Sequence, residues 1–404
     1  MDNASLRGQP ALGLWLSEIR LTAFRNYQQL QLPLLQAPVV LHGPNGAGKT
    51  NLLEAVSLLA PGRGLRRAGR DELACHDFVG HDLAGHDLAP DNHQTDNLKA
   101  GSPAANPCWA ISARVQNKDG AHQLGTGIQP EESRRSVRLD GQPASQSDLG
   151  MLCAVSWLTP QMDGLFLGSP SARRRFIDRL AIAFDPAHVG RLSRYERAYR
   201  ERGKLLAAGT ADAAWLTSLE AVLAETGVAI MATRAALIAD LNRESLACDT
   251  GFPKAELAMQ GGGADMLANH PAVDIEDHIL SEAKAMRMAG DSAMPGPQAS
   301  DLYARHLGHG RPAHLASTGE QKALLISIIL AHARLQARRL HRPPLLILDD
   351  VAAHLDKDRR RDLFAACHDL SGQIWYSGTD RSDFSPLHGQ AQFLQVDNGQ
   401  IYAD

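Results

Sequence analysis

The 404-residue chain has little cysteine, few aromatic residues and no long apolar run. Its five cysteines are odd in number, lie far apart and never form a C-x-x-C pair, which argues against a disulfide framework and a zinc site. No stretch of about 18 uninterrupted apolar residues occurs, so a transmembrane helix is not supported. The segment Met1–Gly13 also lacks the basic start and apolar core of a secretory signal. We therefore expect a cytoplasmic protein with reduced cysteines.

The chain also lacks a strong excess of charge of either sign. Its 41 Lys+Arg and 45 Asp+Glu give a formal net charge of −4, so composition makes no global electrostatic case for nucleic-acid binding. Any DNA-binding surface must be local, and each arginine cluster taken alone is equally consistent with a solvated helix face. Four clusters stand out: Arg66, Arg67 and Arg70; Arg134, Arg135 and Arg138; Arg173–Arg175; and Arg191, Arg194, Arg197, Arg200, Arg202 and Lys204.

A glycine-rich turn, Gly43–Thr50, fits the phosphate-loop pattern G-x-x-x-x-G-K-[ST] without a mismatch. It follows an apolar run, Val39–His42, and precedes a predicted helix, whose positive dipole end would face bound phosphate. Glycines let backbone N–H groups approach phosphate oxygens closely. We predict a nucleoside triphosphate site in which Lys49 neutralises the outer phosphates and the Thr50 hydroxyl binds Mg²⁺. The expected contacts are Gly43, Pro44, Asn45, Gly46, Ala47, Gly48, Lys49, Thr50 and Asn51.

A second apolar run, Leu345–Leu348, ends in two carboxylates, Asp349 and Asp350. A phosphate-loop protein needs such a strand to complete the Mg²⁺ coordination. Asp349 is predicted to hold the metal shell, and Asp350 to orient or deprotonate the attacking water. The alternative is that the strand ends in aspartate only for solubility. The apolar helix Leu324–Leu330 before this strand indicates an α/β nucleotide-binding sheet.

The remaining pattern indicates strands near both the start and the middle of the chain and a long helical region from Ser171 to Arg243, with breaks at Asp185-Pro186 and Gly209. We interpret this region as an antiparallel helical arm. The predicted strands are Leu14–Leu21, Val39–His42, Trp109–Val115 and Arg134–Leu139, with turns at Asp119-Gly120 and Asp140-Gly141. The predicted divisions are a disordered tail at 1–13, an N-terminal part of an ATPase head at 14–165 with a mobile insertion at 80–107, a helical lever arm at 166–295, and the C-terminal part of the head at 296–404.

The stretch Leu315–Gln321 resembles the signature motif of ABC-type ATPases, in which a serine hydroxyl and a glycine N–H at a helix N-terminus receive a γ-phosphate. The resemblance implies that this motif docks on the nucleotide of a second copy of the chain. Leu355-Asp356 is similar to the D-loop of the same superfamily, and Gln161 to its Q-loop residue. The residues so implied are Ser317, Gly319, Gln321 and Asp356 for the nucleotide, and Gln161 for the metal and for catalysis.

Taken together, the motifs resemble the RecF family of DNA replication and repair ATPases. Transporter motors share the phosphate loop, the signature and the metal strand, but lack the start Phe24–Tyr27 and the element Arg173–Asp178. These two elements favour the RecF family over the alternative of an ABC-type motor subunit of a transporter. The matching motifs, in the family's order, are Phe24–Tyr27, Gly43–Thr50, Ser169-Pro170 with Arg173–Asp178, Gly296-Pro297 with Asp301-Leu302, Ser317–Gln321, and Asp349-Asp350 with Leu355-Asp356.

The resemblance implies an α/β ABC/SMC-like ATPase head with a coiled-coil-like helical lever arm, ATP and Mg²⁺ as cofactors, and Arg25 and Asn26 as further nucleotide contacts. It also implies an ATP-dependent homodimer that clamps DNA at junctions of single and double strands, without a membrane partner. RecO and RecR would help it direct RecA onto gaps in support of the SOS response. A weak, DNA-stimulated ATPase would reset the dimer. A nucleotide-binding scaffold whose ATP merely fixes the fold is the third alternative.

Three positions depart from the family's pattern. Gly296–Leu302 lacks the usual histidine and arginine, so no role of those two residues can be carried over. Gln161 stands where the family usually has an acidic residue. The strand ending in Tyr376–Asp380 has no histidine at the switch position of transporter motors, and Thr379 is the nearest polar residue. Slow hydrolysis would follow from this last difference.

Overall fold

The computed structural model describes residues 12–75, 108–129, 132, 134–209, 212–352 and 355–404, which form two compact units. One unit contains the described residues up to Pro160 together with Gln336–Asp404, and the other is Gln161–Leu335. The predicted insertion 80–107 and nearly all of the predicted tail 1–13 lie outside the described residues. The second unit contains the predicted arm, but it extends to Leu335, beyond the return to the head that we placed at 296.

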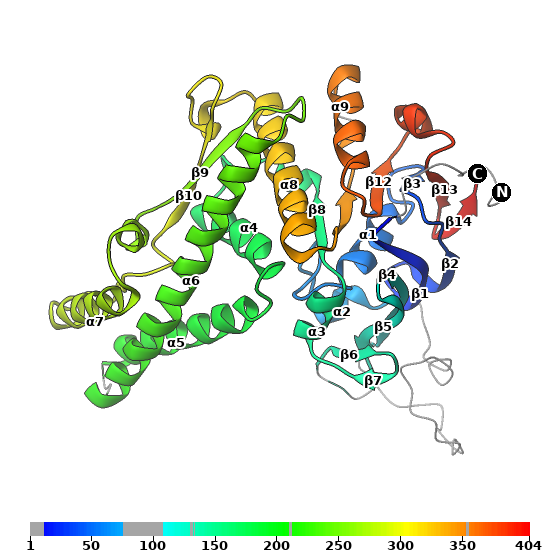
Figure 1. Ribbon diagram of the computed structural model, residues 1–404. Coiled ribbons are helices and arrows are strands. Elements are labelled where there is room, and N and C mark those ends of the chain that lie inside the picture. Colours follow the sequence, from blue (N-terminus) through cyan, green and yellow to red (C-terminus); the bar gives the residue numbers. More distant parts are fainter. Residues whose placement is uncertain (1–11, 76–107, 130–131, 133, 210–211, 353–354) are drawn as a thin grey trace, which may run out of the picture. The chain divides into compact units, whose positions relative to one another are not determined.

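The first unit holds an antiparallel six-stranded sheet with the strand order β2-β1-β4-β5-β6-β7 (Figure 1). The turn between its last two strands uses positive φ angles at Asp140 and Gly141, of 49° and 78°. The strands are β1 (Leu14–Phe24), β2 (Tyr27–Pro33), β4 (Trp109–Asn117), β5 (Gly120–Ile128), β6 (Ser136–Leu139) and β7 (Gln142–Pro143). Strands β1, β4 and β6 confirm the sequence prediction, whereas β2, β5 and β7 were not predicted.

The second sheet of this unit has the order β14-β13-β3-β12-β11-β8. All neighbours in it are parallel except the pair β13 and β14. Four of its strands are buried along their whole length, as expected for parallel strands covered on both faces. The strands are β3 (Val39–His42), β8 (Val155–Leu158), β11 (Leu345–Leu348), β12 (Ile374–Gly378), β13 (Gln392–Asp397) and β14 (Gln400–Ala403).

The α-helices that lie wholly within the described part of the first unit are α1 (Lys49–Ser57), α2 (Arg70–Leu73), α3 (Gln146–Leu152) and α9 (Lys357–His368). One fully buried amide, that of Gln373, bonds to segments from both sheets. Its oxygen accepts from the backbone N–H of Leu16 and the indole of Trp375, each at 3.1 Å. Its nitrogen donates to the carbonyls of Leu35 and Ala37 at 3.1 and 3.2 Å. All the hydrogen-bonding capacity of this amide is therefore used, which avoids the cost of burying it unpaired.

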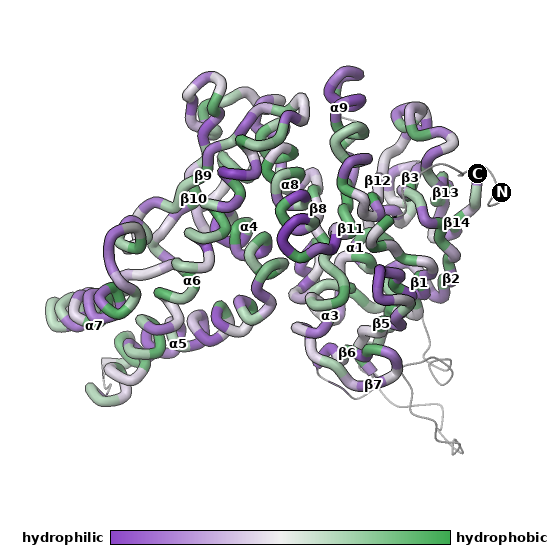
Figure 2. The backbone as a smooth tube through the Cα atoms, in the orientation of Figure 1, coloured by the Kyte–Doolittle hydropathy of each residue, from purple (hydrophilic) through white to green (hydrophobic). Residues whose placement is uncertain are grey.

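The second unit is mainly helical. Helices α5 and α6 run antiparallel and pack together (Figure 1). Helix α5 ends at Ala208 and is capped by Gly209, whose φ is +65°. Both colours of the hydropathy scale alternate along α5 and α7, as expected for helices with one face on a core (Figure 2). The predicted helices between Ser171 and Arg243 and their two breaks are confirmed, but β9, α7 and β10 were not predicted. The elements are α4 (Pro170–Ile182), α5 (His188–Ala208), α6 (Ala213–Ala247), α7 (Ala272–Met288), the antiparallel pair β9 (Ala255–Gln260) and β10 (Asp301–His306), and α8 (Thr318–Leu340), whose residues up to Leu335 belong here.

Helix α6 is, within the described residues, the one helix long and apolar enough to cross a membrane by length and composition. However, 56% of its most apolar window is buried inside the protein. Its residues Leu223, Val228 and Met231 lie in the same core cluster as Ile275 and Ile279 of α7. A core helix of a globular unit gives this same pattern.

A buried histidine on α8, His332, makes the stability of the second unit depend on pH. Burial lowers the pKa of His332 to about 4 from 6.5. Its Nε2 lies 2.9 Å from the carbonyl of Leu180, which can only accept, so this nitrogen carries the proton of the neutral ring. The unfolded chain binds a proton at this residue below pH 6.5, whereas the folded chain does so only near pH 4. Stability is therefore complete above pH 6.5 and lost as the pH falls toward 4.

We predict that His332→Gln flattens this pH dependence, because the amide can still donate to Leu180 but does not titrate. The lowered pKa of His332 corresponds to a loss of about 3 kcal/mol in the free energy of unfolding of the wild type between pH 7.5 and 4. Urea unfolding of both proteins at pH 7.5, 6 and 5 measures the difference. If both proteins lose stability equally over this range, His332 is not the responsible group.

Candidate functional site

The phosphate loop lies between β3 and α1, as predicted, and its three glycines adopt positive φ angles. The values are 145° at Gly43, 82° at Gly46 and 116° at Gly48, a region that disfavours side chains. A Cβ on Gly43 would come within 2.1 Å of the carbonyl oxygen of Val396 in β13. These glycines are therefore required by the shape of the loop and by its close approach to a neighbouring strand.

Residues far away in the sequence hold the back of this loop. The hydroxyl of Tyr27, a buried residue, donates to the carbonyl of Gly48 at 3.0 Å. The amide of Asn26 lies 3.4 Å from the carbonyl of Ala47. The same carbonyl accepts from the backbone N–H of Gly399, in the turn between β13 and β14, at 3.0 Å. The loop is thus fixed from two sides before any nucleotide binds, which lowers the entropic cost of binding.

Lys49 points back into the phosphate loop. Its ammonium donates to the carbonyls of Gly43 and Pro44 at 2.7 and 2.9 Å. Burial lowers the pKa of Lys49, and the charges of Asp350 and Asp349 oppose this effect. The ammonium is therefore held at the mouth of the loop, where phosphate oxygens would replace carbonyl oxygens as its partners.

The predicted metal ligands Thr50 and Asp349 meet in the structure. The Thr50 hydroxyl donates to Oδ1 of Asp349 at 3.3 Å, and the Ser377 hydroxyl donates to the same oxygen at 2.6 Å. Burial, together with the neighbouring Asp350, raises the pKa of Asp349. A carboxylate and a hydroxyl are oxygen ligands of the kind that Mg²⁺ prefers, so this pair fits the predicted ion. Sequence reasoning missed Ser377, whose place beside Asp349 depends on the register of β11 and β12.

Asp350 has a backbone conformation that few side chains adopt, with φ of +57°. Its N–H donates to Oγ of Ser377 at 2.9 Å, which fixes the turn after β11. Within the described residues, its buried Oδ1 has no hydrogen-bond partner. An acceptor without a partner next to the predicted metal ligands is suited to receive a proton from water, so the geometry is compatible with the predicted role.

Arg25, predicted as a nucleotide contact, is already bonded within the protein. Its Nε and Nη2 donate to the two carboxylate oxygens of Glu54 at 2.8 and 3.0 Å, and Glu54 is fully buried. Its Nη1 donates to the carbonyl of Glu72 at 2.6 Å. Asn26 and Asn51, also predicted, are bonded to each other at 2.7 Å. Sequence reasoning missed Glu54, a charge on the buried face of α1 that orients Arg25.

The signature residues lie in the second unit, at the start of α8. Ser317 precedes the helix and Gly319 is in its first turn, and both are exposed. Gln321 is buried, and its amide donates to the carbonyl of Ala316 at 2.9 Å. Gln161, in the short η1 helix (Pro160–Met162), is exposed in this same unit. Gln321 therefore shapes the turn, while Ser317, Gly319 and Gln161 lie exposed at the surface.

Asp356 belongs to the first unit and begins α9. Its carboxylate accepts from the backbone N–H of Arg359 at 2.8 Å, and Leu355 beside it is buried. This N-cap fixes the start of the helix. Its predicted contact with a nucleotide remains a prediction.

Several of the clustered arginines are structural. Arg135 donates to Thr126 and to the carbonyls of Gly62 and Leu58, and burial lowers its pKa to about 10. Arg202 is buried against Glu220 at 3.0 Å. On the exposed side of α5, four cations remain at the surface: Arg194, Arg197, Arg200 and Lys204.

The motif residues Arg173–Asp178 bond to the stretch that follows Gly296 in sequence. Arg173 pairs with Asp301 through two hydrogen bonds of 2.8 and 2.6 Å. Asp178, largely buried, accepts from Nε and Nη2 of Arg234 at 2.8 Å each, and Arg234 also donates to the carbonyl of Pro297 at 2.9 Å. These family-like motifs therefore join α4, α6 and β10 within the second unit.

Comparison with known proteins identifies relatives over nearly the whole chain. The family model described as the RecF/RecN/SMC N terminal domain matches residues 15–376. The DNA replication and repair protein RecF of Mesorhizobium japonicum is 42% identical over 397 residues, covering 96% of this chain and 97% of that protein. RecF of Agrobacterium fabrum is 42% identical over 396 residues, covering 96% and 98%.

Solved structures show the same fold. A structure of the recombination mediator protein RecF-ATPrS in the RecFOR pathway matches with a TM-score of 0.79 and 18% identity, covering 97% of this chain and 99% of that chain. The Smc head domain of Pyrococcus furiosus bound to part of ScpA matches with a TM-score of 0.50 and 15% identity, covering 97% and 96%. The predicted fold, an α/β ATPase head of the ABC/SMC type, is confirmed.

We predict that Tyr27→Phe weakens ATP binding, because it removes the hydrogen bond that holds the carbonyl of Gly48. The matched control is Tyr376→Phe, which removes a buried hydroxyl bonded to Cys367 in the same unit. Each change should lower the free energy of unfolding by about 1 kcal/mol. Only Tyr27→Phe should reduce the affinity for ATP, measured by calorimetry. Equal affinities for ATP in the two variants would show that the hydrogen bond from Tyr27 to Gly48 does not shape the phosphate loop.

Proposed function

This chain belongs to the RecF/RecN/SMC N-terminal domain family and, within it, to the RecF proteins, and we propose that it is an ATP-dependent DNA-binding protein of recombinational repair and replication restart. The observation that supports the proposal is the hydrogen bond of 3.3 Å between Thr50, the last residue of the phosphate loop, and Asp349, which follows β11. Curated relatives at 42% identity are named DNA replication and repair proteins. In this proposal ATP controls how the protein holds DNA.

ATP and Mg²⁺ are the proposed cofactors. The phosphate loop and Lys49 would hold the triphosphate, and Asn26 and Arg25 would border it. Thr50 and Asp349 would hold Mg²⁺ with Gln161, and the ion would neutralise charge between the outer phosphates. Asp350 would accept a proton from the attacking water through its unpaired Oδ1. The phosphate loop, Thr50, Asp349 and Asp350 of the first unit would thus supply one half of the hydrolysis site.

A complete site needs a second copy of the chain. Ser317 and Gly319 lie exposed at the N-terminus of a long helix, an arrangement suited to a phosphate group. Asp356, exposed at the start of α9, would lie at the same seam. ATP bound to one copy would then be held by the signature of the other, so binding drives dimerisation and hydrolysis releases it.

The DNA contacts are proposed to be local and directed to the backbone, because the chain is acidic overall. The exposed cations of α5 are candidates, and one of them, Arg194, pairs with Glu225 of α6 at 3.2 Å. Contacts with phosphates carry no sequence information, so recognition would rest on the shape of a gap or junction. RecO, RecR and, indirectly, RecA are the proposed partners at such gaps, with the SOS response as the setting and the cytoplasm as the location.

Hydrolysis is proposed to be slow and to serve as a reset. Thr379, exposed after β12, is the polar residue nearest to the place where transporter motors have a histidine. A threonine hydroxyl does not ionise near neutral pH and cannot replace an imidazole as a proton carrier. DNA would stimulate turnover by favouring the dimer.

We predict that ATP strengthens binding to gapped DNA, and that Lys49→Arg removes most of this effect. The larger, planar guanidinium cannot make the two short carbonyl contacts of the ammonium. Fluorescence anisotropy with gapped, single-stranded and blunt duplexes, with and without ATP, measures the change. Equal binding without nucleotide would contradict the ATP-controlled clamp.

We predict that Ser317→Arg keeps ATP binding but abolishes ATP-driven dimerisation, because the signature acts on the nucleotide of the other copy. Light scattering reports the mass of each protein with and without ATP, and calorimetry reports ATP binding. A variant that still dimerises with ATP would remove Ser317 from the dimer interface. A wild type that stays monomeric with ATP bound would favour a scaffold role instead.

A further inference from the structure

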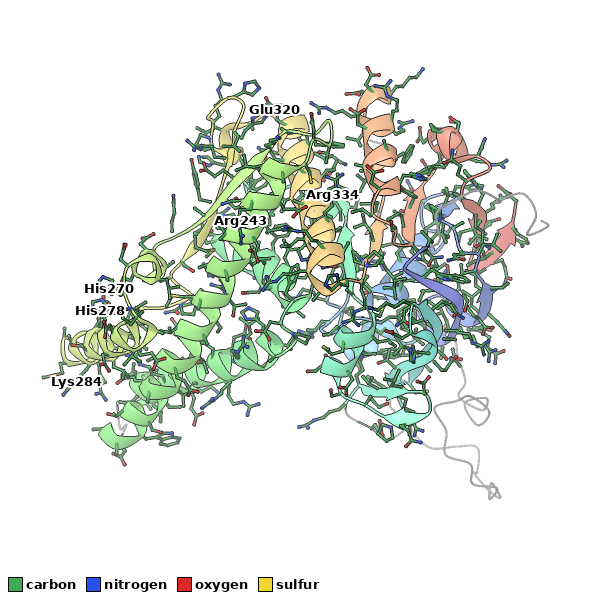
Figure 3. The ribbon with its side chains drawn as sticks, viewed as in Figure 1. Arg243, His270, His278, Lys284, Glu320 and Arg334 are labelled. Atoms are coloured by element: carbon green, nitrogen blue, oxygen red, sulfur yellow. The ribbon has the colours of Figure 1, made fainter. Side chains whose placement is uncertain are left out.

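The carboxylate of Glu320 is hydrogen-bonded to Ser317, the serine of the signature. Its Oε2 accepts from the backbone N–H and from the hydroxyl of Ser317, each at 2.8 Å. In return, Oγ of Ser317 lies 3.4 Å from the N–H of Glu320. These bonds form a capping box, which satisfies two groups at the start of α8. Figure 3 labels Glu320 at this place. The hydroxyl proposed to meet a phosphate is therefore already bonded to an anion.

The carboxylate stays ionised in this position. The N–H and hydroxyl of Ser317 lower the pKa of Glu320, and the charges of His309 and His306 lower it further. His306 is the last residue of β10 and His309 follows the strand, and their rings stack with centroids 4.5 Å apart. The N-terminus of α8 favours a negative charge, so the Glu320 carboxylate is stable there when no other anion is bound.

We infer that Glu320 sets the affinity of the signature for triphosphate, by competing as an internal anion for Ser317. This inference rests on the proposed function of the signature. A phosphate oxygen that accepts from the Ser317 hydroxyl must take the place of Oε2, because a hydroxyl has one proton to donate. The carboxylate must then turn away, and the stacked His306 and His309 offer it a cationic or hydrogen-bonding neighbour.

The competition weakens the ATP-driven dimer in a graded way. A carboxylate that remains near Ser317 repels the phosphate, and one that leaves gives up two hydrogen bonds. In both cases Glu320 makes the free energy of dimerisation less favourable. A neutral side chain of the same shape would keep the capping box and remove the repulsion, so the dimer should tighten.

The chain contains a matched control for this experiment. Asp148 forms the same capping box with Ser145 at the start of α3, in the other unit. The hydroxyl and N–H of Ser145 donate to Oδ2 of Asp148 at 2.8 and 2.7 Å. Asp148→Asn removes the same charge from the same motif, at a helix without a signature.

The test compares the wild type with Glu320→Gln and Asp148→Asn, using full-length chains with Mg²⁺ and ATP. Sedimentation gives the dimer dissociation constant, and calorimetry at concentrations that keep the chain monomeric gives ATP affinity. We expect Glu320→Gln to lower the dimer constant about tenfold, or about 1.4 kcal/mol. ATP binding by the monomer should not change, and Asp148→Asn should match the wild type in both measurements.

The outcomes separate the inference from the function on which it rests. If the wild type dimerises with ATP and Glu320→Gln is no tighter, the competition is wrong while the composite site stands. If neither protein dimerises with ATP, both are wrong. Glu320→Ala, which removes the charge and the cap together, serves as a second variant, and a tighter dimer is expected from it as well. A weaker dimer in both Glu320 variants would assign the residue a purely structural role.

Discussion

The register of three parallel strands is the constraint on which the site depends. Strands β3 and β12 end side by side, with Gly378 beside His42, and β11 ends two residues earlier, with Leu348 beside Tyr376. The chain leaves β3 as the phosphate loop and leaves β11 at Asp349. Ser377, on the strand between them, can then donate to Asp349 while the Thr50 hydroxyl reaches the same oxygen from α1. A slip of one residue in any strand would turn these side chains to the opposite face.

Local sequence patterns were enough to predict the parts of this arrangement that come from short, continuous segments. The phosphate loop, the strand before Asp349 and the helices of the arm each carry their signal within a short window of sequence. Ser377 and Glu54 carry none, because their meaning comes from partners elsewhere in the chain, Asp349 and Arg25. The pair β9 and β10 was missed for the same reason, since it joins segments on either side of α7.

The motifs that distinguish this family from transporter motors have a structural basis in the second unit. Arg173 and Asp178 both lie on α4. Arg173 bonds to Asp301, and Asp178 bonds to Arg234. A buried carboxylate is stable only when it is paired, so Asp178 requires Arg234. Arginines that looked like DNA contacts in the sequence include such members of the core. A basic cluster can therefore be interpreted only when the burial of each side chain is known.

The hydrogen bond between Gly399 and the carbonyl of Ala47 joins a late part of the chain to an early one. The phosphate loop is synthesised near the beginning, together with the Tyr27 that supports it, but β13 and β14 leave the ribosome near the end. A nascent chain can therefore hold the loop only from one side. Nucleotide binding of full strength would begin only once this hairpin has been synthesised and has paired, which couples readiness for ATP to the completion of the head.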